Sequence, residues 1–63
     1  MAHDEQELYT YRVRVGHWEV QLKARSADEA IEVARRRLSA ELPRLYDVIR
    51  ALTATRFQVE AAA

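Results

Sequence analysis

The stretch YTYRVRVGHWEVQLKA, residues 9–24, is the most informative part of this sequence. Apolar or aromatic residues occupy every second position on both sides of Gly16 and His17, and mostly polar residues stand between them. Strict alternation of this kind is typical of a strand that buries one face. A two-residue loop that begins with glycine closes a tight hairpin. The stretch therefore predicts two antiparallel strands joined at Gly16 and His17.

The loop also predicts which residues of the two strands face each other. A two-residue Gly-X loop of type II′ makes Val15 and Trp18 direct partners, and the pairing then runs outward to Tyr9 and Ala24. One face collects the apolar side chains, namely Tyr9, Tyr11, Val13, Val15, Trp18, Val20, Leu22 and Ala24. The other face collects Thr10, Arg12, Arg14, Glu19, Gln21 and Lys23, with Arg14 opposite Glu19. Turn chemistry and both strand patterns thus agree on one register.

A helix is predicted directly after the hairpin. Residues 26–29, Ser-Ala-Asp-Glu, have the form of a capping box, in which the serine hydroxyl and the glutamate carboxylate accept backbone N–H groups at the helix start. Apolar residues then recur at helical spacing. Pro43 disfavours helical geometry at the residue before it, so the helix should end between Ser39 and Leu42. The run Arg35 to Arg37 fans around the helix, and we interpret it as a solvated surface.

Residues 43–60 are predicted to form a shorter helix and a third strand. Pro43 suits the first position of a helix, and an apolar stripe follows it at Leu45, Val48, Ile49 and Leu52. An alternative has a loop up to Tyr46, with Asp47 capping a single turn. Residues 56–60 alternate again, with Phe57 and Val59 on the apolar face. This pattern predicts a short strand.

The predicted fold is a single α+β domain over residues 8–60, in the order ββααβ. Both helices should cover one face of a three-stranded sheet, which can be antiparallel or mixed, and the order of the strands stays open. Residues 1–7 are interpreted as a solvated acidic tail and residues 61–63 as a frayed terminus. The expected core contains Trp18, Val20, Leu22, Ile31, Leu38, Ile49 and Phe57.

Composition excludes several classes of protein. The 63 residues include ten basic and ten acidic side chains, so the net charge of zero creates no overall attraction to nucleic acid or to a membrane surface. No apolar run approaches the ~20 residues of a membrane-spanning helix. The lack of cysteine excludes disulfides and cysteine-based zinc sites, and it fits the reducing cytoplasm, where we expect this protein.

We expect no catalytic, cofactor or metal site. His3 and His17 are isolated, whereas a metal site needs several converging ligands. The carboxylates at residues 28, 29 and 32 are explained by capping and by the positive end of the helix dipole. The single glycine gives no phosphate-binding loop.

The leading functional hypothesis is a non-enzymatic protein-interaction module that forms a homo-oligomer, such as a homodimer, or binds another protein. Its basis is the small size of the domain and the open edges of its sheet. The alternative is a nucleic-acid-binding module that uses the open face of the sheet. That face is expected to carry a basic excess, with Arg12, Arg14, Lys23, Arg25 and Arg56 against Glu19 and Glu60.

Overall fold

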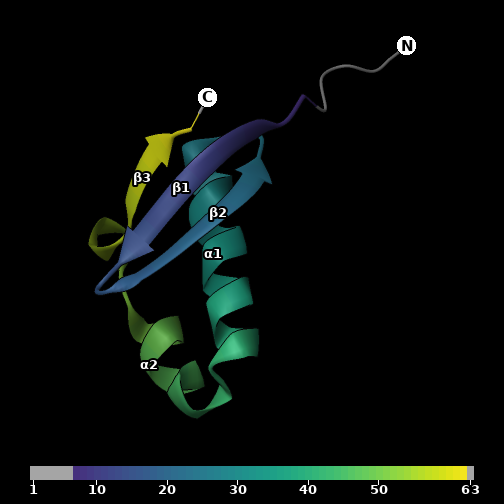
Figure 1. Cartoon of the computed structure of the whole chain (residues 1–63). Helices are drawn as coiled ribbons and strands as arrows, with labels where there is room; N and C mark the ends of the chain where they lie inside the picture. The colour runs from purple at the N-terminus through teal and green to yellow at the C-terminus, as the bar shows by residue number, and fades with distance from the viewer. Residues whose placement is uncertain (1–6, 63) are drawn as a thin grey trace.

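A computed structural model describes residues 7–62 of the chain. Its elements are β1 (Tyr9–Val15), β2 (Trp18–Ala24), α1 (Ala27–Glu41), the 3₁₀ turn η2 (Pro43–Leu45), α2 (Tyr46–Ala51), the 3₁₀ turn η3 (Ala54–Arg56) and β3 (Gln58–Ala61). The strands and α-helices follow the predicted order ββααβ, and the helices lie on one side of the sheet (Figure 1).

The hairpin has the predicted register. β1 and β2 pair antiparallel from Val15 opposite Trp18 to Tyr9 opposite Ala24. Gly16 has a φ of 61°, a value that glycine adopts without steric strain. Both favoured two-residue hairpin turns require a positive φ at this first loop position. The local sequence signal at Gly16 therefore sets the pairing of the whole hairpin.

The strand order that the sequence leaves open is β2-β1-β3, so β1 is the central strand. β3 runs antiparallel to β1, with Val59 opposite Val13. After α1 and α2 the chain returns as β3 on the far side of β1 from β2, so one edge of β2 has no partner strand among residues 7–62.

The core lies between the apolar face of the sheet and the helices. Its buried members are Val13, Val15, Leu22, Ala24, Ala30, Ala34, Leu38, Ile49 and Phe57. Four of the seven predicted core residues belong to this set. The other three, Trp18, Val20 and Ile31, pack against it but are only partly buried. The alternation of the hairpin therefore places its apolar face inward, as predicted.

The predicted start and end of the first helix are confirmed. The Ser26 hydroxyl accepts the N–H of Glu29 at 3.2 Å, and α1 ends at Glu41. One detail of the expected capping box differs, because the Glu29 carboxylate accepts the N–H of Arg25 at 2.6 Å. That donor lies one residue before the cap.

The third strand begins later than predicted. Residues 54–56 form η3, in which the Arg56 N–H donates to the Thr53 carbonyl at 3.0 Å, so Arg56 is not part of the strand. β3 instead continues to Ala61, and the N–H of Ala62 donates to the Thr10 carbonyl at 2.8 Å. Pairing therefore persists where fraying was expected. The predicted acidic tail lies outside the described residues, apart from the exposed Glu7.

Candidate interaction surfaces

The outer face of the sheet is the surface on which a basic patch was predicted. Arg12 lies on the central strand, so it has a carboxylate on each side: its Nε is 3.3 Å from Oε2 of Glu19 on β2, and its Nη1 is 3.4 Å from Oε1 of Glu60 on β3. The predicted cross-strand ion pair of Arg14 and Glu19 is thus replaced by a diagonal one, although these two residues do face each other in the ladder. The most central cation of this face is therefore already paired.

The structure brings together only three of the five predicted cations. Arg12, Arg14 and Lys23 lie on the outer face by strand alternation. Arg25 lies beyond the end of β2, where its Nη2 is 3.4 Å from the Glu29 carboxylate at the start of α1. Arg56 lies in η3. Three cations and two carboxylates leave an excess of one positive charge on the face, whereas an excess of three was expected.

The Glu29 carboxylate that holds Arg25 has a perturbed pKa. The N–H of Arg25 is the largest cause, followed by the hydrogen bond from the Arg25 side chain, and both lower the pKa of Glu29 below its ordinary value. Hydrogen bonds and a nearby cation favour the ionised carboxylate. The contacts between Arg25 and Glu29 link the end of β2 to the start of α1.

The free edge of β2 is a second candidate surface. In a two-residue hairpin the closing pair is hydrogen-bonded, and such pairs alternate with pairs whose backbone groups point away from each other. Counting from Val15 and Trp18, the N–H and C=O groups of Glu19, Gln21 and Lys23 point away from β1, toward the open edge.

One arginine from α1 reaches this edge. Nη1 of Arg37 donates to the Gln21 carbonyl at 3.0 Å, so Arg37 covers the middle of the edge. Within residues 7–62, no side chain makes a corresponding hydrogen bond to the backbone N–H or C=O groups of Glu19 and Lys23. The sequence does not indicate this contact, because the run Arg35 to Arg37 favours a solvated surface.

The edge of β3 is shorter. The bond from Ala62 to Thr10 shows that Thr10, and by alternation Arg12 and Arg14, direct their backbone groups toward β3. The backbone N–H and C=O groups of Val59 and Ala61 therefore point outward, on a strand of only four residues. This edge offers a partner fewer backbone groups than the seven-residue β2 does.

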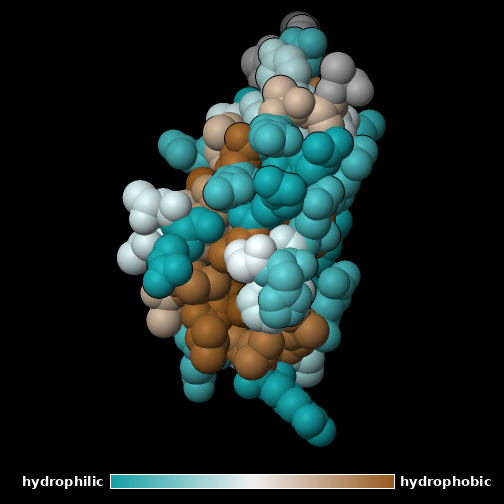
Figure 2. All heavy atoms as spheres, turned by 60° about the vertical axis from the view of Figure 1, so that its left-hand side comes forward, coloured by the Kyte–Doolittle hydropathy of each residue, from teal (hydrophilic) through white to brown (hydrophobic). Residues whose placement is uncertain are grey.

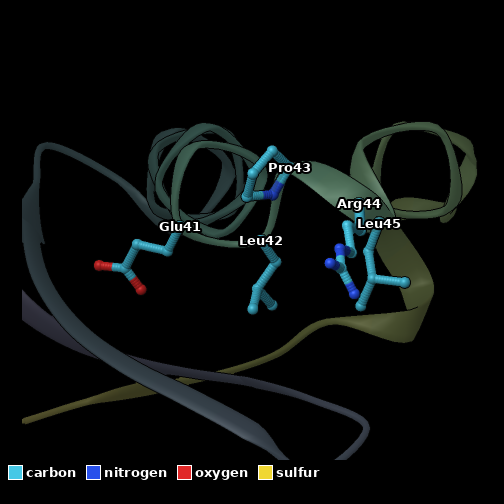
Figure 3. A pocket seen from close by; sticks show the side chains of 5 residues that line it. All are labelled: Glu41, Leu42, Pro43, Arg44 and Leu45. Atoms are coloured by element: carbon cyan, nitrogen blue, oxygen red, sulfur yellow. The ribbon is translucent and has the colours of Figure 1, made fainter.

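A third surface lies at the end of the helices. Tyr46 and Val48 are exposed by 50% and 54%, and η2 borders a hollow of about 410 Å³ whose lining includes Leu42 and Leu45 (Figure 3). Figure 2 shows apolar side chains gathered in the lower half of the molecule, where Figure 1 places α2. Because α1 runs past the hairpin, none of the strands β1, β2 and β3 covers this end of the helices.

Arg35 is a charged side chain that the fold buries, although the sequence placed it in solvent. It is 9% exposed, and its Nη1 donates to the carbonyls of Ile49, Arg50 and Leu52 at 2.9, 3.3 and 2.8 Å. Its Cζ lies 5.0 Å from the ring centroid of Phe57. Arg35 stands four residues after Ile31, on the flank of the apolar stripe, and this spacing was the available sequence signal. Its role is to join α1 to the end of α2.

A metal site and a membrane-spanning helix are both absent from the described residues. In the stretch 7–62, no three side chains of His, Asp or Glu are grouped so that they could hold a metal ion. No helix there combines the length and the apolar character needed to cross a bilayer.

Comparison with protein-family models, curated proteins and solved structures finds no significant match to this chain. The surfaces of the sheet and of the helices are therefore the features from which a function can be proposed.

Proposed function

We propose that this chain is a small protein-interaction module that self-associates as a homodimer. The observation that carries the proposal is the open edge of β2, a seven-residue strand with three residues whose backbone groups point outward. An unpaired edge of this length is a template for another strand. β2 contains no proline to prevent pairing, and its register with β1 runs without a bulge.

Size adds a reason for two copies to associate. A domain of about 60 residues buries only about 60% of the surface that its unfolded chain exposes. Pairing through the edges of β2 would join two three-stranded sheets into one and would cover more of Trp18 and Val20, which the monomer leaves partly exposed. The stability of a protein that dimerises in this way rises with its concentration.

Nucleic-acid binding draws less support from the geometry. Arg12 is paired on both sides, and the outer face carries an excess of one positive charge. Its remaining side chains are polar and include no aromatic ring on which a base could stack. Retention of duplex DNA at low salt, lost in an Arg12→Glu/Arg14→Glu variant, would nevertheless favour this function over self-association.

The direct test is the oligomeric state in solution. Light scattering from about 1 to about 100 μM should show a mass that rises from the monomer's 7.3 kDa toward twice that value, and the Tm should rise over the same range. Gln21→Pro should shift the equilibrium toward monomer, because it removes an outward-facing N–H while proline is tolerated at a free edge.

A matched control lies on the third surface. Val48→Ser removes an exposed apolar side chain from α2 and should leave the mass unchanged. A monomeric mass at the highest concentration, with a Tm that is insensitive to dilution, would overturn the proposed function. Dissociation by Val48→Ser and not by Gln21→Pro would move the interface from β2 to α2.

A further inference from the structure

We infer that two copies of this chain pair β2 against β2, antiparallel, about a twofold axis at Gln21, so that Glu19 of each copy lies opposite Lys23 of the other. The inference rests on the proposed self-association and adds to it the register of the interface and the residue that opposes pairing.

Backbone geometry centres the pairing on Gln21. Three residues of β2 point their N–H and C=O groups outward, and Gln21 is the middle one. An antiparallel pairing that uses all three residues must place Gln21 of one copy opposite Gln21 of the other. It then places Glu19 of each copy opposite Lys23 of the other. Each of these pairs exchanges two backbone hydrogen bonds. A twofold axis also makes the interface closed, so that association stops at the dimer.

Charge selects the same register. With the axis at Gln21, opposite charges face each other at both ends of the interface. With the axis moved to Glu19 or to Lys23, like charges would meet directly, which is destabilising. Lys23 has no ion-pair partner among residues 7–62, and the Glu19 side chain is half exposed beside Arg12. Both groups are therefore accessible to a second copy.

The apolar face of β2 agrees with this register. Strand alternation places Val20 opposite Leu22, and Trp18 opposite Ala24, on the side of the sheet that covers the core. The larger side chain of each pair thus meets a smaller or similar one. Since a slip of one residue would turn the apolar side chains outward, the core restricts the register as well.

Arg37 opposes this pairing. Its Nη1 occupies the Gln21 carbonyl at the axis, where the N–H of Gln21 from the second copy must donate. In the dimer this N–H competes with Nη1 of Arg37 for the same carbonyl oxygen, and two Arg37 side chains come close to the same axis. Covering an edge and placing a positive charge on it are both devices that limit strand pairing.

The register is tested with two charge-reversed variants. Glu19→Lys and Lys23→Glu should each weaken the homodimer by about tenfold or more, because each places like charges at both ends of the interface. An equimolar mixture, with one variant labelled with ¹⁵N, should form heterodimers, because opposite charges then meet at both ends. Native mass spectrometry distinguishes the three species.

The outcomes separate the inference from the proposed function. If both variants dimerise like the wild type and mix statistically, the register is wrong while self-association stands. If the wild type is monomeric, both fail. The Tm of each variant, measured when dilute, checks that the monomer is folded, since Glu19→Lys also removes the contact with Arg12.

The same assay tests Arg37. Arg37→Ala should tighten the dimer several-fold, whereas the matched control Arg36→Ala removes the same charge from an exposed neighbouring position of α1 and should change little. Equal effects of the two substitutions, or a weaker dimer in Arg37→Ala, would overturn the role assigned to Arg37.

Discussion

At the scale of single residues, the run Arg35 to Arg37 shows how burial separates three identical side chains. Arg35 donates to three carbonyls near the end of α2, Arg37 donates to the edge of β2, and Arg36 is exposed with no hydrogen bond among the described residues. The last carbonyls of any helix lack intrahelical partners, and they also carry the negative end of its dipole. A cation placed there stabilises the end of α2 and, through it, the path of the chain to β3.

Arg35→Ala should therefore lower the free energy of unfolding by about 2–4 kcal/mol, because it removes the charged donor of the Ile49 and Leu52 carbonyls together with the contact with Phe57. Urea denaturation measures this quantity. The control Arg36→Ala should stay within about 0.5 kcal/mol of the wild type. Similar losses in the two variants would show that Arg35 does not anchor α2.

The sequence did not distinguish these three arginines, and the reason is physical. Helical spacing predicts that Arg35 lies on the flank of the apolar stripe, but a flank is buried only if another element covers it. That element is α2, whose position depends on the turn at Pro43 and on packing across the whole domain. The contact of Arg37 with β2 likewise depends on how far α1 lies from the edge of the sheet.

At the scale of elements, the start of α1 links folding to pH. The N–H of Arg25 and its side chain lower the pKa of Glu29 in the folded protein, so this carboxylate stabilises the fold when it is ionised. A lowered folded-state pKa gives stability that is complete above the unfolded-state pKa and is lost as pH falls through the folded-state value.

Glu29→Gln should accordingly lower the Tm at pH 7, and the difference from the wild type should shrink once the pH falls below about 4. Thermal unfolding at pH 7 and pH 3 tests this expectation. Glu41→Gln, which removes an exposed carboxylate from the other end of α1, should have little effect at either pH. A difference for Glu29→Gln that persists unchanged at pH 3 would contradict the role of its charge.

The elements differ in how well their bounds and pairing could be predicted from the sequence. The hairpin register followed from Gly16 and from alternation alone, because both signals are local. The bounds of the third strand did not, since the alternation of residues 56–60 begins at Arg56, the last residue of η3, and the N–H groups of Arg56 and Phe57 are used within that turn. Alternation correctly placed Arg12, Arg14 and Lys23 on one face. The pairing of Arg12 with Glu60 could not be foreseen, because it requires β3 to lie beside β1.

At the scale of the whole molecule, the fold leaves its longest open edge on one side and its exposed apolar end on another. β3 pairs with the central strand and so leaves β2 uncovered apart from the contact with Arg37 within the described part of the chain. The helices run past the hairpin and expose Tyr46 and Val48. Self-association through β2 would use the first of these surfaces and leave the second free.

Backbone amide exchange measured by NMR at low and high protein concentration reports this pairing most directly. The amides of Glu19, Gln21 and Lys23 point away from β1, so they should exchange rapidly in dilute solution and become protected as the concentration rises. The amides of Val59 and Ala61 point away from β1 on the opposite edge and should stay unprotected throughout. Unchanged exchange at Glu19, Gln21 and Lys23 over a concentration range in which the mass doubles would contradict pairing through β2.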